Sequence, residues 1–224
     1  MGAGPLDDTR FVGYRRKLIE DIRARGIDDL ETLQYFDRVP RHLFLPEGVR
    51  PRAYEDAPIP IGFGQTASQP SLQAYYLSLL QPQRTEKVLE IGTGSGFLTA
   101  LLALCSDRVY SVERVRELSV RARVALDAMA VQNVALMVGD GTIGWKKYQP
   151  FNVIVVSAGG PSIPSALVDQ LADGGRMLIP VGGRDSQELV HVRKTGFLVT
   201  EDVVKDDVTF VPLLGQFAWK AEGG

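Results

Sequence analysis

The stretch Val88-Leu-Glu-Ile-Gly92-Thr-Gly94-Ser-Gly96 decides the fold that we expect for this chain. It is an apolar run that ends in three alternate glycines, a pattern typical of a buried strand followed by a tight turn. Because glycine has no Cβ, such a turn lets the backbone approach a ligand closely. The next apolar run ends in an acid, Glu113, which on a neighbouring strand can accept hydrogen bonds from a ribose diol. The stretch therefore predicts a nucleoside site.

The spacing of the glycines indicates which nucleoside is bound. A dinucleotide fingerprint would place its third glycine at position 97, where this chain has Phe97. The rhythm of Gly92, Gly94 and Gly96 favours S-adenosylmethionine over NAD as the cofactor. No Gly-Lys-Ser/Thr follows the turn, so the P-loop interpretation fails. A strand bounded by flexible glycines is the structural alternative, against which the acid at Glu113 argues.

Length and composition bound the organisation of the chain. With 224 residues, 45% of them hydrophobic, it can bury one substantial core, so we expect a single domain over residues 1–224. A net charge of -2 and a pI near 5.8 argue against a large basic face. We therefore expect no nucleic-acid partner.

Cysteine, histidine and targeting patterns exclude several other classes. The one cysteine, Cys105, lies in an apolar helical pattern and is expected to be a small buried thiol. His42 and His191 lack metal-ligand spacing, so we expect no metal. The start has no basic or apolar targeting region, and no run approaches membrane-spanning length. We expect a soluble cytoplasmic protein with neither a membrane partner nor an obligate protein partner.

The first part of the chain, residues 1–80, is expected to be a helical and substrate-side segment. Apolar residues recur at roughly helical intervals between residues 11 and 36, which predicts two amphipathic helices separated at Gly26. From Pro40 to Pro70 the chain is dense in proline and glycine, yet rich in apolar and aromatic residues. Ordered loops of this kind often line sites, so we expect a substrate-side loop there.

The second part, residues 81–185, is expected to be the cofactor-binding core. Strand-like and helix-like segments alternate along it, which predicts an α/β fold with a doubly wound, mostly parallel sheet. The expected strands are Val88–Ile91, Val109–Val112, Val134–Val138, Phe151–Val156 and Met177–Val181, with helices near Phe97–Leu104, Leu118–Met129 and Pro164–Leu171. Gly174-Gly175 is expected to be the turn between the last helix and the last strand.

The third part, residues 186–224, has a different pattern. Successive strands are expected at Leu189–Val192, Phe197–Val204 and Val208–Pro212, with Gly196 in one of the turns. An antiparallel edge is therefore expected to extend the parallel sheet.

Polar residues follow the expected parallel strands, and in a doubly wound sheet such strand ends meet in one ligand-binding crevice. The glycine turn, Glu113, Asp140-Gly141 and Ser157–Gly160 occupy these positions. We expect Glu113 to bind the ribose hydroxyls and Asp140 to accept from the adenine amino group, with the small Gly141 beneath the ring. For each acid the alternative is a helix cap or a solvated loop end.

A second polar segment, Gly64-Gln-Thr66-Ala67-Ser68-Gln69-Pro70, precedes a helix-like run. A hydroxyl beside a proline at a helix start is commonly a capping residue. The alternative is that Ser68 and Thr66 donate hydrogen bonds at the mouth of the cofactor site, and the two roles are compatible.

These segments together resemble the protein-L-isoaspartate O-methyltransferase family, a branch of the Rossmann-like, S-adenosylmethionine-dependent methyltransferases. The resemblance covers nearly the whole chain, and the proline-rich and C-terminal blocks are more specific than the glycine turn. The matching blocks are Val39–Pro46, Ala53–Asp56, Pro58–Gly62, Gly64–Pro70, Val88–Gly96, Val109–Arg114, Gly139–Gly141, Gly174–Gly182 and Phe210–Leu213.

The resemblance implies an activity and a set of site residues. The activity is transfer of a methyl group from S-adenosylmethionine to the α-carboxylate of isoaspartyl residues in damaged proteins and peptides, which leaves S-adenosylhomocysteine. Ser68 would be the catalytic residue. The cofactor would be bound by Thr66, Glu90, Gly92, Thr93, Gly94, Gly96, Glu113, Arg114, Asp140 and Gly141. The acceptor would contact Ala67, Ser68, Ala158, Gly159 and Pro212.

Departures from the family pattern concern the acceptor side. Ala67 stands where a β-branched residue is usual, and Ser71–Gln73 and Ser157–Gly160 also differ. Asn152 and Phe97 replace a usual aspartate and tyrosine. A related methyltransferase acting on another carboxylate, in a modified peptide or small metabolite, is therefore the enzyme alternative. A noncatalytic nucleoside-binding protein of the same fold is the alternative from another class.

Overall fold

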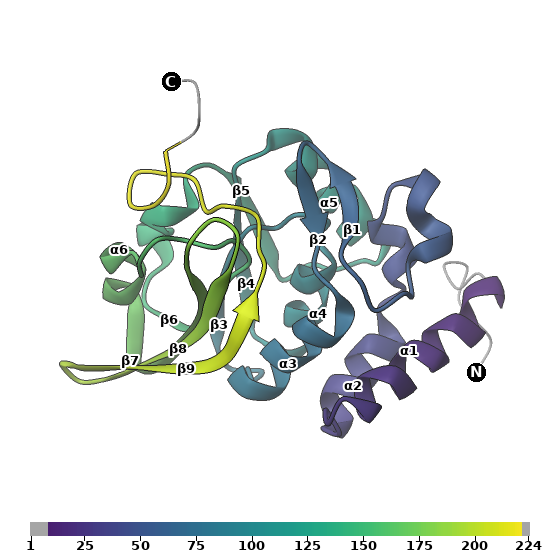
Figure 1. Cartoon of the computed structure of the whole chain (residues 1–224), viewed down its shortest axis with the longest axis horizontal. Helices are drawn as coiled ribbons and strands as arrows, with labels where there is room; N and C mark the ends of the chain where they lie inside the picture. Colours follow the sequence, from purple (N-terminus) through teal and green to yellow (C-terminus); the bar gives the residue numbers. More distant parts are fainter. Residues whose placement is uncertain (1–8, 221–224) are drawn as a thin grey trace.

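The computed structural model describes residues 9–220 and contains one seven-stranded sheet with helices packed against it (Figure 1). The strand order is β5-β4-β3-β6-β7-β8-β9, in which the strands from β5 to β7 are parallel and β8 and β9 are antiparallel. The strands are β3 (Lys87–Ile91), β4 (Arg108–Glu113), β5 (Val134–Val138), β6 (Phe151–Val156), β7 (Leu171–Gly182), β8 (Gln187–Thr195) and β9 (Leu198–Val208). The predicted mostly parallel sheet with an antiparallel C-terminal edge is confirmed.

Two apolar cores cover the two faces of this sheet. One face packs against α3 (Pro70–Leu80), α4 (Phe97–Cys105) and α5 (Arg116–Ala128). The other packs against α6 (Ser165–Asp169) and the loop that carries Trp145. Residues alternate between the cores along each strand, as in Val88 and Leu89, because successive side chains of a strand point to opposite faces.

The N-terminal helices α1 (Val12–Ala24) and α2 (Leu30–Arg38) confirm the predicted helix pair, and they lie at the opposite end of the molecule from the β8–β9 hairpin (Figure 1). Gly26, with φ of 88°, separates them as expected. The irregular segment that follows is more ordered than its composition suggests. It contains the short helices η2 (Arg41–Phe44) and η3 (Glu47–Arg52) and the hairpin of β1 (Ile59–Gly62) and β2 (Gln65–Ala67).

Of the two predicted turns, the one at Gly196 is observed between β8 and β9, whereas the one at Gly174-Gly175 is wrong. Gly174 and Gly175 lie inside β7 at a bulge, because the strand begins at Leu171, whose partner on β6 is Phe151. A Cβ on Gly175 would lie 2.8 Å from the Ala172 carbonyl oxygen, so glycine allows the crowding of this bulge. The expected helix over 164–171 is accordingly shorter.

The end of the chain also differs from expectation. There is no separate strand over 208–212, because β9 runs unbroken to Val208. The chain then leaves the sheet edge and crosses to the end of β6, where Pro212 forms an isolated bridge with Gly159. This crossing brings residues 211–214 to the ends of the parallel strands.

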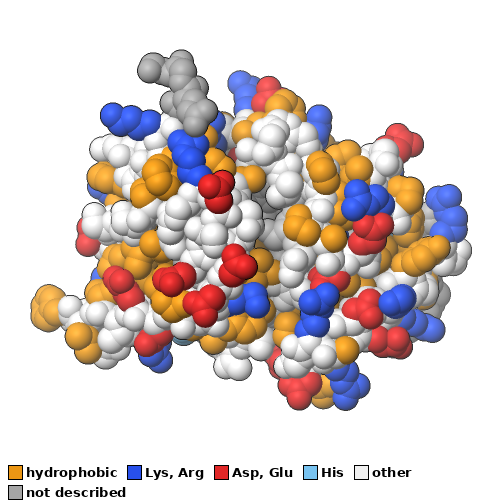
Figure 2. Space-filling view, in the orientation of Figure 1, with side chains coloured by type: hydrophobic (Ala, Val, Ile, Leu, Met, Phe, Trp, Pro, Cys, Tyr) orange, Lys and Arg blue, Asp and Glu red, His pale blue; other side chains and the backbone are white. Residues whose placement is uncertain are grey.

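The edge strand β9 carries charges on its exposed positions. Figure 2 shows acidic side chains gathered over this part of the molecule, where Glu201, Asp202, Asp206 and Asp207 are exposed. Charged side chains on an edge strand disfavour pairing with another chain. None of the helices within residues 9–220 has the length and apolar character needed to cross a bilayer.

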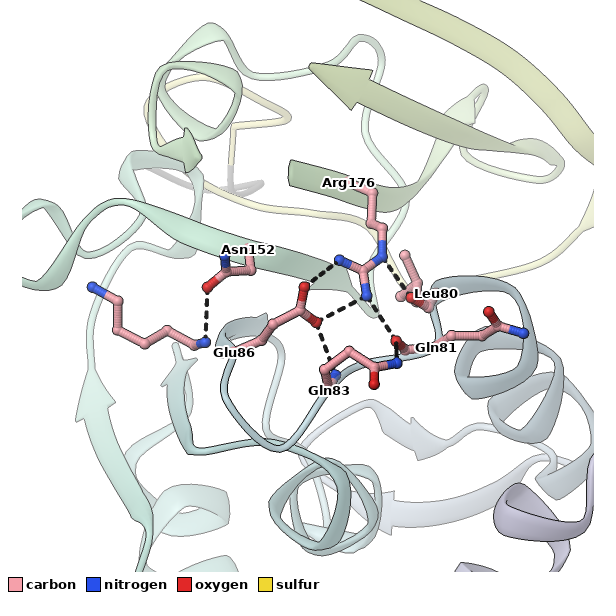
Figure 3. Close-up of polar contacts among 7 residues, drawn as sticks. Leu80, Gln81, Gln83, Glu86, Asn152 and Arg176 are labelled. Atoms are coloured by element: carbon pink, nitrogen blue, oxygen red, sulfur yellow. Dashed lines mark hydrogen bonds and ion pairs between the residues drawn. The ribbon is translucent and has the colours of Figure 1, made fainter. Parts of the chain in front are cut away.

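At the N-terminal ends of the parallel strands, Arg176 of β7 joins three segments (Figure 3). Its guanidinium donates to both carboxylate oxygens of Glu86 at 2.8 and 2.9 Å, and to the carbonyl oxygens of Leu80 and Gln81. Burial raises the pKa of Glu86, but the hydrogen bonds from Arg176 and from the Gln83 amide outweigh it and leave the pKa below its ordinary value. This cluster ties the end of α3 to the sheet.

Candidate active site

A cavity lies at the opposite, C-terminal ends of the parallel strands, where β3, β4, β5 and β6 deliver the glycine turn, Glu113, Gly141 and Ser157. The loop after β2 and the segment 211–214 close it from the other side. Of the residues predicted for the site, those that line the cavity are Thr66, Ala67, Ser68, Gly92, Thr93, Gly94, Glu113, Arg114, Gly141, Ala158 and Pro212. The four that do not are Glu90, Gly96, Asp140 and Gly159.

Glu113 lies in the cavity wall with its carboxylate held by backbone amides. The Gly94 amide donates to one oxygen at 2.8 Å and the Val115 amide to the other at 2.9 Å. Within residues 9–220 no Lys or Arg forms a salt bridge with Glu113. Each carboxylate oxygen can accept a further hydrogen bond. The carboxylate is therefore oriented and remains able to accept from the hydroxyls of a ligand.

Gly96 serves the packing of the helices and does not reach the cavity. Its φ is 85°, and a Cβ there would lie 2.9 Å from the Ala122 Cβ of α5. Glycine is thus needed for the close approach of α4 to α5. Gly94, with φ of 52°, is the member of the turn whose amide reaches Glu113.

Glu90 lies beneath the glycine turn and is fully buried. The hydroxyls of Thr99 and Ser111 both donate to one of its oxygens at 2.6 Å, and the Ser111 hydroxyl is 2.5 Å from that of Thr93. Burial raises the pKa of Glu90 to about 7; the two hydroxyl hydrogen bonds oppose this shift and the charge of Glu113 adds to it. Glu90 does not line the cavity, and its hydrogen bonds connect it through Ser111 to Thr93, which does.

Asp140 caps the short helix η4 (Gly141–Ile143) and is not among the residues that line the cavity. Its Oδ1 accepts from the amide and the hydroxyl of Thr142, at 2.8 and 2.7 Å. The capping alternative is thus observed for this acid, whereas its neighbour Gly141 lines the cavity and packs tightly on Ile91.

Ser68 lies between β2 and α3, and the capping role considered for it belongs to other groups. Gln69 is the N-cap residue and makes no side-chain cap, while Asp56 Oδ1 accepts from the Ser71 amide at 2.8 Å. The Ser68 carbonyl oxygen accepts from the Nη2 of buried Arg41 at 3.0 Å. The hydroxyl of Ser68, which lines the cavity, has no hydrogen-bond partner among the described residues.

Arg41 fixes the serine loop from behind. It is 1% exposed, its Nη1 donates to the Ala53 carbonyl at 2.7 Å, and its guanidinium lies 5.6 Å from the centre of the Phe97 ring. Burial lowers the pKa of Arg41 to about 10, which leaves it charged at neutral pH. One buried cation therefore links two loops of the N-terminal segment to the start of α4.

Several cavity residues were not identified from the sequence as site residues. Gln73 lines the cavity, is 7% exposed, and its carboxamide oxygen has no hydrogen-bond partner in the described part of the chain. An unsatisfied buried acceptor is costly, so a ligand donor is its natural partner. The departure from the family pattern at 71–73 was the signal available. Leu213 and Leu214 directly follow the predicted site residue Pro212, and the family block that ends at Leu213 was the signal available for them.

A second cavity continues from the first on the side of Ser68. The two share Thr66, Ser68, Ser157 and Val211. Its lining is mixed: Leu72 and Phe210 are apolar, while Lys205 and Asp207 are charged. Two ligands could therefore meet at Thr66 and Ser68.

The one cysteine, Cys105, is buried and does not line the cavity. Burial raises the pKa of the Cys105 thiol to about 12, which agrees with the predicted buried thiol. In the described ranges no group of three or more His, Cys, Asp or Glu side chains is placed to hold a metal ion.

Comparisons with known proteins agree on one family. A model of the protein-L-isoaspartate(D-aspartate) O-methyltransferase family matches residues 14–218. A protein-L-isoaspartate O-methyltransferase from Geobacter metallireducens is 46% identical over 93% of this chain and 97% of its own length. One from Desulfotalea psychrophila is 47% identical over 95% of this chain and 99% of its own.

Solved structures agree as well. A Plasmodium falciparum structure described as a protein-L-isoaspartate O-methyltransferase in complex with S-adenosyl-L-homocysteine has a TM-score of 0.79 at 26% identity, covering 89% of this chain and 98% of that one. Another protein-L-isoaspartate O-methyltransferase has a TM-score of 0.81 at 27% identity, covering 91% of this chain and 67% of that one. The chain belongs to the protein-L-isoaspartate(D-aspartate) O-methyltransferase family.

Proposed function

We propose that this protein transfers a methyl group from S-adenosylmethionine to the α-carboxylate of L-isoaspartyl residues in proteins and peptides. The observation that carries the proposal is the meeting of two cavities at Thr66 and Ser68, one beside the glycine turn and Glu113, the other between the serine loop and residues 205–211. The family membership names the reaction, and the two adjoining cavities support a site for its two substrates.

The residues of the first cavity fit the cofactor. Glu113 would accept from the ribose hydroxyls, and the turn at Gly92–Gly94 would pass close to the methionyl part. Gly141 and Leu214 would bound the adenine. Gln73 would offer its free carboxamide oxygen to a donor of the cofactor. When bound, the cofactor supplies an electrophilic methyl group on a sulfonium.

The chemistry asks little of the protein as an acid or base. A carboxylate with an ordinary pKa near 4 is already ionised at neutral pH, so no general base is needed. The chain must instead hold the acceptor in line, an effect worth roughly 7–11 kcal/mol in well-oriented systems. We assign to Ser68 and the loop amides the hydrogen bonds that replace the water of the carboxylate.

A neutral hydroxyl suits this task better than a cation would. Negative charge on the acceptor is lost as the new bond forms, so a strong donor would stabilise the ground state more than the transition state. Ser68 supplies a hydroxyl, and its loop is held by Arg41 through the backbone, away from the acceptor.

Methylation would begin a repair sequence. The methyl ester closes spontaneously to a succinimide, whose hydrolysis returns some normal aspartate. Isoaspartyl proteins and peptides are therefore the proposed partners. The cytoplasmic location, the lack of nucleic-acid or obligate protein partners and the three-part division at residues 80 and 185 stay predictions from the sequence.

The proposal is tested with labelled S-adenosylmethionine and a matched pair of peptides. A peptide containing isoaspartate should acquire a base-labile methyl ester, while the same peptide with normal aspartate should not. Equal labelling of both peptides, or of neither, would reject the acceptor assignment. A panel of small carboxylates and modified peptides then tests the departures at Ala67 and at Ser157–Gly160.

A further inference from the structure

The loop that follows the cavity wall, residues 213–219, is closed on itself; we call it the C-terminal loop. The Trp219 amide donates to the Leu213 carbonyl and the Gly215 amide donates to the Trp219 carbonyl, both at 3.0 Å. Leu213 and Leu214, at its base, line the first cavity. The Leu213 amide also donates to the Gly159 carbonyl oxygen at 2.8 Å, so Leu214 is the one of the two whose position depends most on what holds the loop.

Asp140 and Thr142 hold the C-terminal loop from outside the cavity. The Gln216 amide donates to Asp140 Oδ2 at 2.7 Å, and the Phe217 amide donates to the Thr142 hydroxyl oxygen at 3.1 Å. The same hydroxyl donates to Asp140 Oδ1 at 2.7 Å. Two side chains at the end of β5 thus bind two successive amides of a segment about 75 residues away in the sequence.

The loop approaches these side chains so closely that only glycine fits at position 215. A Cβ there would collide with the Asp140 carboxylate and would lie 2.7 Å from the Thr142 hydroxyl oxygen. Gly215 does not have a positive φ, so an alanine meets no backbone penalty and its effect is confined to this contact.

We propose that Asp140 is a positioning residue that fastens the C-terminal loop and thereby places Leu214, next to the anchored Leu213, in the wall of the cofactor cavity. The inference rests on the proposed function, since it takes that cavity to be the S-adenosylmethionine site. Asp140 does not line the cavity, and three donors already occupy its two oxygens. Its contribution to cofactor affinity then comes through the loop, in place of the direct hydrogen bond to the adenine amino group expected from the sequence.

The test measures binding of S-adenosylhomocysteine by calorimetry to three variants of the full chain. Gly215→Ala and Asp140→Asn should each weaken binding about tenfold, and the double variant should bind no more weakly than the weaker single one, because both remove one contact. Gly183→Ala is the matched control, since a Cβ there has its nearest neighbour at 3.7 Å. Normal affinity in Gly215→Ala, or fully additive losses in the double variant, would overturn the proposal.

An analogue separates the loop from a direct contact with adenine. S-inosylhomocysteine carries an oxygen where the adenine amino group stands. The loss caused by Asp140→Asn should be the same for both ligands if the residue acts through the loop. A loss that disappears with the inosyl analogue would assign Asp140 to the amino group and overturn the proposal.

A second pair of variants covers the case in which Gly215→Ala does not fold. Thr142→Val removes the hydroxyl that accepts from the Phe217 amide, and Thr142→Ser restores it. We expect about a tenfold rise in KM for S-adenosylmethionine in the first and recovery in the second, with kcat and the KM for peptide little changed. Equal behaviour of the two variants would overturn the proposal.

These measurements also separate the inference from the proposed function. A protein that binds S-adenosylhomocysteine through the loop but methylates no isoaspartyl peptide would refute only the acceptor. If the protein methylates the peptide and its cofactor affinity is unchanged in Gly215→Ala and Thr142→Val, only the role of Asp140 is refuted. A protein that does not bind the cofactor would refute both.

Discussion

The two ends of the parallel sheet use carboxylates in different ways. At the N-terminal ends, Glu86 is paired through both oxygens with Arg176 (Figure 3). At the C-terminal ends, Glu113 and Asp140 accept from backbone amides and a hydroxyl, and no lysine or arginine of residues 9–220 forms a salt bridge with either. In the first arrangement, the positive charge of Arg176 balances the charge of Glu86 and the ion pair stabilises the fold. In the second arrangement, no cation of residues 9–220 pairs with Glu113 or Asp140, and both lie at the end of the sheet where a cationic cofactor is proposed to bind.

Removing the cation at the N-terminal end should have the largest effect, and only on stability. Arg176→Ala leaves Glu86 largely buried without its partner and frees two carbonyls of the α3 end. We expect a loss of about 3 to 4 kcal/mol in the free energy of unfolding, measured with urea. Affinity of the folded protein for S-adenosylhomocysteine should not change. A comparable loss of affinity would erase the contrast between the two ends.

Removing the acid at the C-terminal end should reverse this pattern. Glu113→Ala takes away the acceptor proposed for the ribose and leaves the Gly94 amide unpaired. We expect roughly a hundredfold weaker cofactor binding, about 2.7 kcal/mol, with a smaller change in stability. Calorimetry and urea unfolding of the same preparation measure both quantities. If the free energy of unfolding falls while the affinity for the cofactor is unchanged, the role of Glu113 is structural, like that of Glu86.

Glu90 tests the comparison through pH. Its pKa is near 7 in the folded protein against 4.5 as the ordinary value, so between these pH values the folded state keeps a proton that the unfolded chain has lost. Stability should therefore fall as pH rises through this window, and the full loss is present above it. Between pH 5 and pH 8 we expect this group to contribute on the order of 2 kcal/mol.

The measurement for Glu90 compares thermal unfolding of the natural protein and Glu90→Gln across that range. The glutamine carries no charge at any of these pH values, so the slope assigned to Glu90 should be absent. Glu86→Gln is the matched control, because the pKa of Glu86 lies below the window. An unchanged slope in Glu90→Gln would show that another group titrates there.

The smallest expected effect is on turnover. Ser68→Ala removes the hydroxyl proposed to bind the acceptor, and we expect about a tenfold lower kcat, or 1.4 kcal/mol, with cofactor affinity unchanged. Steady-state kinetics with an isoaspartyl peptide measure kcat, and the Kd for S-adenosylhomocysteine is the control. An unchanged kcat would leave the hydroxyl without a role in the reaction.

Local patterns predicted what local physics controls. The apolar run before Gly92 and the acid at Glu113 follow strand and turn rules, and both lie where expected. Glu90 lies in the same motif, yet its side chain is bound by Ser111 of the neighbouring strand, a contact that no local rule reveals. Likewise, position 96 must be glycine because Ala122 of another helix lies against it, and Asp140 accepts a hydrogen bond from the distant Gln216 amide.

The remaining errors come from strand pairing. Gly174 and Gly175 have the composition of a turn, but pairing with β6 begins before them and makes them a bulge. The pattern near Val208 predicted the start of a separate strand, but pairing with β8 continues along β9 as far as Val208. In both cases the partner strand decided the outcome.

The two proposed halves of the site, Glu113 and the serine loop, are held in place by different parts of the fold, and the buried guanidinium of Arg41 holds the second. Glu113 ends strand β4 of the sheet. The serine loop is instead held by Arg41, 27 residues earlier, which donates to the carbonyl oxygens of both Ser68 and Ala53. Because the same guanidinium lies 5.6 Å from the centre of the Phe97 ring, directly after the glycine turn, Arg41 sets the position of the serine loop relative to the proposed cofactor site.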